Sequence, residues 1–385
     1  MRRTTRSQAS ILLTVLLLGL ALFPSRAQAK DKLLEEAVEF TGTMFFLESK
    51  VPGLVLGAIR NDETAVAGFG KMGAQADKAP DGKTLMRIGS ITKAFTGQML
   101  ASLVSDGLVR FTDPLQKRVG WDVKIPQKDG KDIRLIDLAT HSSGLPREVE
   151  RAPGPADNPF QTMTKEALIR NLQGDPLLFA PGTGVLYSNF AFDLLAQALA
   201  NAAGKPYEDV LRERVLDATG LASTVFTLNA EQQTRLMQGH DFDGTPLPDA
   251  PSVPMISGAG GLYSSADDML RWLAWHLDRF STTGAETRFL DHAAYLPRDG
   301  LNPVLGLDES GHMDAMGLGW VVMMPRGTRP LILQKAGGLQ GIFSYTAFAP
   351  TRGVGVFIAI NQFNLGAALK MAEIVNEFIA TLAPR

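Results

Sequence analysis

Segments typical of β-strands lie near the two ends of this chain, and segments typical of helices fill its middle. Residues 55–60 and 64–69 form one strand-like pair across a short polar turn. The strand-like segments near the other end are residues 318–324, 330–335, 343–349 and 353–360. Because short turns join antiparallel neighbours, we expect one antiparallel sheet that both ends of the chain build together.

Apolar residues at helical spacing predict helices through the middle of the chain and at its C-terminal end. The predicted helices cover residues 91–108, 135–140, 190–203 and 365–382, and one more begins at Ser265 and ends near residue 278. Residues 282–315 are rich in Gly, Pro and Asp, and this composition predicts a long loop or insertion.

The fold class predicted from this order is α/β (α+β), with an antiparallel sheet flanked by helices and a mostly helical domain inserted into it. We assign residues 30–95 and 255–385 to a sheet subdomain and residues 96–254 to a helical subdomain. An active site is expected where the two subdomains meet, since ligand sites favour such seams.

Residues 1–29 have the three-part pattern of a secretory signal peptide. Three arginines lie among the first six residues, an apolar run covers residues 11–23, and Ala27-Gln28-Ala29 supplies small residues for cleavage after Ala29. A retained transmembrane anchor is the alternative, but the run is short for a span. We therefore expect export to the periplasm without a permanent membrane span, and peripheral membrane association stays open.

Composition excludes several classes of function. The formal net charge is −2 and no basic cluster follows the first residues, so no nucleic-acid partner is expected. The chain has no Cys, which removes disulfides, thiolate metal sites and Cys nucleophiles. The five His residues are scattered, and the G-x-G-x-x-G at residues 68–73 is not followed by a helix, so neither a metal nor another cofactor is predicted.

The strongest candidate for a nucleophile is Ser90, in the sequence Ser90-Ile91-Thr92-Lys93. A helix is expected to begin at about Ser90, where unpaired backbone N–H groups and the positive dipole end favour an oxyanion. Lys93 shares a helix face with Ser90, so its amine can accept the Ser90 proton when it is neutral. Alone, this motif is weak, because a capping Ser followed by a solvated Lys has the same spacing.

Tyr187 and Asn189 form a second candidate pair. Residues i and i+2 of an extended segment point the same way, so both side chains can face one cavity. A phenol can relay protons in catalysis, and an amide can hold a substrate carbonyl. A capped helix entry with a core Tyr is the alternative interpretation.

The third candidate element is Lys335-Ala336-Gly337-Gly338, which is predicted to end a strand. A strand edge without side chains at Gly337 and Gly338 lets a substrate backbone approach. The Gly338 N–H is a candidate oxyanion donor beside the Ser90 N–H. Lys335 is a candidate for binding a carboxylate and for lowering the pKa of Lys93. An ordinary glycine turn after an edge strand is the alternative.

Together, Ser-x-x-Lys, Tyr-x-Asn and Lys-x-Gly in this order resemble the motifs of the serine β-lactamase superfamily. The Tyr-x-Asn element is similar to that of class C β-lactamases and their carboxypeptidase and esterase relatives. Residues 141–148 resemble a loop of this superfamily. Residues 187–196 and 317–321 resemble the AmpH-type D-alanyl-D-alanine carboxypeptidase/endopeptidases, which are periplasmic, class C-like penicillin-binding proteins.

This resemblance covers nearly the whole mature chain and implies a β-lactamase/transpeptidase-like fold. It also implies that peptidoglycan peptides and β-lactams are the partners, with Ser90, Lys93 and Tyr187 as catalytic residues. The substrate-binding residues would be Asn189, Lys335, Gly337 and Gly338. One departure from the family pattern is Ala336, which stands where a Thr is usual and removes a hydroxyl expected to bind a carboxylate.

Three functions fit these residues. The first is a serine DD-peptidase that acts through an acyl-enzyme on Ser90. The second is a class C-like β-lactamase or a serine carboxylesterase with the same site, and Ala336 makes the esterase more credible. The third is a non-catalytic cell-wall or penicillin-binding module, which ranks low because the reactive residues are all present. The sequence does not assign the primary base between Lys93 and Tyr187, and it does not predict the oligomeric state.

Overall fold

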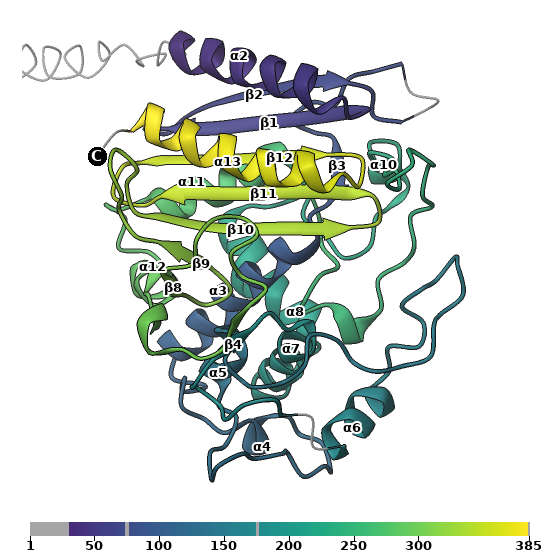
Figure 1. Cartoon of the computed structure of the whole chain (residues 1–385), viewed down its shortest axis with the longest axis vertical. Coiled ribbons are helices and arrows are strands. Elements are labelled where there is room, and N and C mark those ends of the chain that lie inside the picture. The colour runs from purple at the N-terminus through teal and green to yellow at the C-terminus, as the bar shows by residue number, and fades with distance from the viewer. Residues whose placement is uncertain (1–30, 74–76, 175–176, 384–385) are drawn as a thin grey trace, which may run out of the picture. The chain divides into compact units, whose positions relative to one another are not determined.

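An eight-stranded antiparallel sheet lies at the centre of the structure, in the order β2-β1-β12-β11-β10-β9-β8-β6 (Figure 1). Its strands are β1 (Gly53–Arg60), β2 (Glu63–Gly70), β6 (Leu296–Pro297), β8 (Ala315–Met316), β9 (Val321–Met323), β10 (Ile332–Leu339), β11 (Ile342–Ala349) and β12 (Val354–Ile360). Strands β1 and β12 are neighbours, with Leu54 opposite Ile360. The sheet that both ends of the chain were predicted to share is therefore confirmed.

The computed structural model describes residues 31–73, 77–174 and 177–383. The predicted signal peptide lies outside these residues. Residues 33–385 form one compact unit, and the division into a sheet and a helical subdomain stays a prediction. In the part of the chain that is described, no helix has both the length and the apolar character needed to cross a membrane.

Side chains alternate between the two faces of the sheet, so each face has its own hydrophobic core. On β1, Leu54 and Leu56 point into a core with helices α2 (Lys32–Ser49) and α13 (Leu365–Leu382), whereas Val55 points into a larger core on the other face. The second core includes helices α3 (Thr92–Ser105) and α11 (Ala266–Leu277). The sheet is thus covered by helices on both sides (Figure 1).

Short helices make up most of the region beside α3. They are α4 (Leu115–Arg118), α5 (Leu135–Ala139), α6 (Lys165–Gln173), α7 (Asn189–Ala203), α8 (Tyr207–Leu211), a π-helical turn η2 (Arg212–Leu216), α9 (Asp217–Thr219) and α10 (Ala230–Gln233). The 3-10 turns are η1 (Gly89–Ile91), η3 (Pro254–Ile256) and η4 (Arg298–Gly300). Two small sheets pair β3 (Leu85–Arg87) with β5 (Tyr263–Ser265), and β4 (Val185–Leu186) with β7 (Val304–Leu305).

One prediction from the sequence is wrong. Residues 282–315 are not one long loop: they contain helix α12 (Ala285–His292), strands β6 and β7, and the start of β8. The Lys335–Gly338 element was predicted to end a strand, and it forms the last part of β10, which pairs with β11 as far as Leu339. In addition, helix α2 was not predicted, and β9 is shorter than the expected strand.

Candidate active site

Ser90 lies in η1, between strand β3 and helix α3. This turn packs closely on β10, because a Cβ atom at Gly89 would lie 2.7 Å from the Gly338 nitrogen. Gly89 also has a φ of +50°, which a residue with a side chain rarely adopts. A glycine before the serine therefore permits both the turn and its contact with the strand.

Lys93 lies one turn along from Ser90 and is fully buried. Its Nζ is 3.1 Å from Ser90 Oγ, 2.6 Å from Asn189 Oδ1 and 2.6 Å from the Ala259 carbonyl oxygen. Burial lowers the pKa of Lys93 from the usual 10.5 to about 7. A lysine in this position is neutral in a substantial fraction of molecules near neutral pH, so it can accept a proton from the serine.

Charged neighbours act on Lys93 in opposite directions. The carboxylates of Asp193 and Glu148 raise its pKa, whereas the guanidinium of Arg147 lowers it. Lys335 was predicted to lower the pKa of Lys93, but burial is the largest cause. Burial also lowers the pKa of Lys335 itself, and the nearby Lys93 and Arg147 act in the same direction.

The loop that carries Tyr187 is held in place by His141. The Ser188 N–H donates to His141 Nδ1 at 3.0 Å, and the His141 and Tyr187 rings stack with their centroids 4.7 Å apart. Burial lowers the pKa of His141 well below its usual range, so the imidazole is neutral. Tyr187 is nearly buried, with Lys93 Nζ 5.0 Å and Lys335 Nζ 4.8 Å from its ring centroid.

Asn189 is the first residue of α7, and the side chain of Ser188 caps that helix by accepting the Ala191 N–H at 3.0 Å. The Asn189 amide is engaged at both ends: Oδ1 accepts from Lys93, and Nδ2 donates to Glu148 Oε1 at 2.6 Å. Glu148 thus orients the amide that faces Lys93. The sequence did not assign this role to Glu148.

Strand β10 forms one wall of the site. It pairs with β9 only over Ile332, Leu333 and Gln334, so its next residues are free of β9 and lie beside η1. A Cβ atom at Gly337 would lie 2.0 Å from the Ile88 carbonyl oxygen, which explains the need for glycine there. The same carbonyl accepts a hydrogen bond from Ser344 Oγ at 3.0 Å, which ties η1 to β11 as well.

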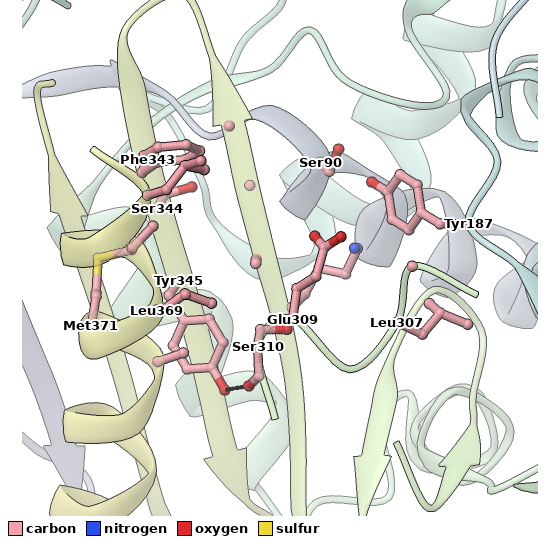
Figure 2. Close-up of a pocket in the computed structure, with 18 of the residues that line it drawn as sticks. Ser90, Tyr187, Leu307, Glu309, Ser310, Phe343, Ser344, Tyr345, Leu369 and Met371 are labelled. Atoms are coloured by element: carbon pink, nitrogen blue, oxygen red, sulfur yellow. Dashed lines mark hydrogen bonds between the residues drawn. The ribbon is translucent and has the colours of Figure 1, made fainter. Parts of the chain in front are cut away.

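A cavity of about 430 Å³ brings the predicted residues together. Six of the seven line it, namely Ser90, Tyr187, Asn189, Lys335, Gly337 and Gly338, and Lys93 lies beneath Ser90. In Figure 2, Ser90 and Tyr187 flank one side of the cavity, while Glu309 and Ser310 project into it. The lining also includes a group of apolar side chains, namely Phe242, Phe343, Phe363, Leu365 and Leu369.

Comparisons with known proteins identify the family of the chain. The profile of the family described as Beta-lactamase matches residues 31–378. The chain is 34% identical over 341 residues to the D-alanyl-D-alanine-carboxypeptidase/endopeptidase AmpH of Escherichia coli strain K12, which covers 88% of this chain and 86% of that protein. It is 23% identical over 351 residues to a beta-lactamase of Pseudomonas fluorescens, covering 86% and 94% respectively.

A solved structure gives the same result. The beta-lactamase/D-alanine carboxypeptidase of Yersinia pestis, complexed with citrate, superposes with a TM-score of 0.81 at 34% identity, covering 92% of this chain and 99% of that one. A class C beta-lactamase structure superposes with a TM-score of 0.78 at 16% identity and supports the fold. The family resemblance is therefore confirmed, and this chain belongs to the beta-lactamase family.

Proposed function

We propose that this protein is a serine DD-peptidase, a D-Ala-D-Ala carboxypeptidase/endopeptidase that acts on peptidoglycan peptides. The observation that carries the proposal is the buried Lys93 amine, 3.1 Å from Ser90 Oγ and with a pKa of about 7. The names of the AmpH relative and of the Yersinia pestis structure, both 34% identical, support this choice of substrate. The predicted signal peptide supports action in the periplasm, beside the polymer.

In this mechanism Lys93 is the general base. Neutral Lys93 takes the proton of Ser90 as Oγ attacks the carbonyl carbon of the scissile peptide bond. The backbone N–H groups of Ser90 and Gly338 hold the oxyanion that forms. The proton then passes from Lys93, with Tyr187 as the relay, to the leaving amine, and the C–N bond breaks to give an acyl-enzyme.

Deacylation repeats the same proton transfers with water. A water molecule attacks the ester carbonyl of the acyl-enzyme, its proton goes to the base, and Ser90 Oγ recovers a proton as it leaves. Asn189 would act in both halves, since its Oδ1 holds Lys93 in place and the residue lines the cavity that would receive the acyl group of the substrate. Penicillins would acylate Ser90 in the same way.

An esterase is the second candidate, and two observations favour it. Ala336 lines the cavity in place of a hydroxyl-bearing residue, which weakens recognition of a substrate carboxylate. The apolar side chains that line the cavity suit an apolar acyl or alcohol group. A class C-like β-lactamase would use the same Ser90 and Lys93, with faster deacylation.

One preparation of the mature protein distinguishes these functions when it is assayed on muropeptides, nitrocefin and a short-chain nitrophenyl ester. The peptidase predicts release of D-Ala or cleavage of cross-links. Ester hydrolysis without any action on muropeptides would refute the peptidase and leave the esterase.

The site itself is tested by labelling with a fluorescent penicillin and mapping the modified peptide by mass spectrometry. Ser90→Ala should abolish the label and all three activities. The matched control is Ser310→Ala, which removes a hydroxyl from the same cavity and should keep the label and the activity. A label on another peptide, or muropeptide turnover by Ser90→Ala, would refute the assignment. A label without any turnover would indicate a non-catalytic penicillin-binding module.

A further inference from the structure

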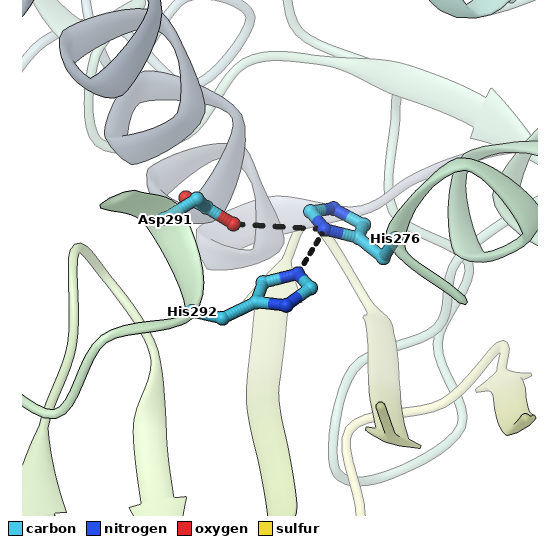
Figure 3. Close-up of side chains that lie close together, drawn as sticks. All are labelled: His276, Asp291 and His292. Atoms are coloured by element: carbon cyan, nitrogen blue, oxygen red, sulfur yellow. Dashed lines mark hydrogen bonds and ion pairs between the residues drawn. The ribbon is translucent and has the colours of Figure 1, made fainter. Parts of the chain in front are cut away.

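Two histidines and an aspartate meet between helices α11 and α12, apart from the residues that line the Ser90 cavity. His276 Nδ1 lies 2.9 Å from His292 Nε2 and 3.6 Å from Asp291 Oδ2. In Figure 3 the three side chains converge, with His276 coming from one helix and Asp291 and His292 from the other. One ligand atom from each residue lies within 4.8 Å of the other two.

The hydrogen bonding of this cluster is incomplete. Asp291 and His276 are fully buried, and Asp291 accepts only one hydrogen bond among the described residues, from Trp320 Nε1 to Oδ2 at 3.0 Å. Its other oxygen has no hydrogen-bond partner there, and no Lys or Arg of the described residues forms an ion pair with it. A buried carboxylate requires a proton or a cation, because an isolated charge is costly in an apolar interior.

Both imidazoles are suited to coordination. His276 Nδ1 and His292 Nε2 lie 2.9 Å apart, so each ring directs one nitrogen into the same space. Neutral imidazole is the form that binds metals, and two imidazoles with a carboxylate are a common zinc donor set.

The spacing of the donor atoms also fits. A tetrahedral zinc ion with bonds of about 2.0–2.1 Å places its ligand atoms about 3.3–3.4 Å apart. The two distances of 2.9 Å and 3.6 Å lie on either side of that value. The remaining pair, His292 and Asp291, has ligand atoms within 4.8 Å of each other.

We propose that His276 Nδ1, His292 Nε2 and Asp291 Oδ2 bind one divalent transition-metal ion of the zinc class, with a water as the fourth ligand. The site is structural. A series of contacts connects the site to α3. Trp320 donates a hydrogen bond to Asp291 and stacks on Trp272, with the ring centroids 5.4 Å apart. Trp272 in turn donates to Gln98 of α3 at 2.7 Å. A bound ion would fix α12 against α11 and stabilise the packing behind the catalytic helix.

The test uses the mature full chain, stripped with a chelator and then incubated with Zn²⁺ or Co²⁺ followed by gel filtration. We expect one ion per chain by elemental analysis and the visible d–d absorption of tetrahedral Co²⁺. The Tm should rise by about 3–5 °C with Zn²⁺ at a hundred times its Kd. Stripped protein that takes up no ion and shows no shift in Tm would refute the proposal.

Variants locate the ion. His292→Gln changes a partly exposed side chain at the end of α12, so it should fold, and it should lose both the stoichiometric ion and the rise in Tm. Asp291→Asn should do the same. The matched control is His312→Ala, since His312 lies on the surface near Asp308 and Asp314, and this variant should still bind one ion. Retention of the ion by His292→Gln, or its loss in His312→Ala, would overturn the assignment.

Discussion

The rate of Ser90 acylation should depend on pH through the charge of Lys93. Burial moves the pKa of this lysine from 10.5 to about 7, which corresponds to about 5 kcal/mol against the charged form. Only the neutral amine can accept the serine proton. A lysine with an ordinary pKa would be neutral in roughly one molecule in three thousand at pH 7, whereas Lys93 is neutral in about half.

The expected profile follows from this fraction. Below pH 7 the neutral fraction falls about tenfold for each pH unit, so the acylation rate at pH 5 should be about a hundredth of the plateau value. Above pH 8 the rate should level off. The assay is the first-order rate of fluorescent-penicillin labelling, measured by rapid quench under excess label from pH 5 to 9.

Two charge variants test whether the fall in rate at low pH, the acid limb of this profile, results from protonation of Lys93. Glu148→Gln removes a negative neighbour that stabilises the ammonium, so the pKa falls and the limb should move to lower pH. Arg147→Gln removes a positive neighbour, so the pKa rises and the limb should move to higher pH. Both residues are exposed, so each shift should be less than about one unit. Tyr187→Phe should lower the plateau and keep the limb.

Two results would refute this reasoning: a rate that does not change between pH 5 and 8, or a shift of the limb in the same direction in both charge variants. A limb that disappears in Tyr187→Phe would assign the base to the tyrosine.

Three further predictions concern packing and specificity. Gly337→Ala places a Cβ atom 2.0 Å from the Ile88 carbonyl oxygen, so the acylation rate should fall by about 100-fold as β10 shifts. The control is Gly300→Ala, whose added Cβ atom meets open space. Equal acylation rates in the two variants would contradict the close packing at Gly337. Ala336→Thr should lower KM by roughly tenfold for substrates with a free carboxylate and leave simple esters unchanged, in steady-state assays of both. Trp272→Ala should destabilise the fold by about 3–5 kcal/mol in urea unfolding, because the ring is fully buried; a loss under about 1 kcal/mol would argue against its central place in the core.

The long elements could be predicted from the sequence because their apolar patterns are long. Helix α13 has the predicted bounds of residues 365–382. Helix α11 begins where predicted, and the side chain of Ser265 caps it by accepting the Asp268 N–H at 3.2 Å. The elements within residues 282–315 are too short for periodicity to detect. Strands β6, β7 and β8 have two residues each, and α12 begins after Gly284 without a capping side chain.

Helix α2 was missed for a different reason. Its apolar residues lie on opposite sides of the helix, because Leu34 and Val38 are buried whereas Leu33 and Phe40 are about 70% exposed. This distribution obscures the single apolar stripe that identifies a helix.

The motifs predicted most residues of the candidate site, but not the groups that hold Lys93 and Asn189 in place. Ser90 and Lys93 are close in sequence, and Tyr187 and Asn189 carry recognisable spacing. The carbonyl of Ala259 and the side chain of Glu148 meet Lys93 and Asn189 only in the folded chain. Neither has a sequence signal of its own, since a backbone carbonyl is common to every residue and a surface Glu is usually solvated.

The pairing of β1 with β12 also determines how much of the chain must be synthesised before the sheet can form. Strand β1 pairs with β2 on one side and with β12 on the other. Leu54 therefore cannot pair until Ile360, far along the chain, is available. Closing such a long loop is slow, because the entropy of the chain is lost before the contacts between the strands stabilise the pair. A nascent chain therefore cannot complete its central sheet until β12 has been synthesised, and β1 lacks its second neighbouring strand while the residues between them are made.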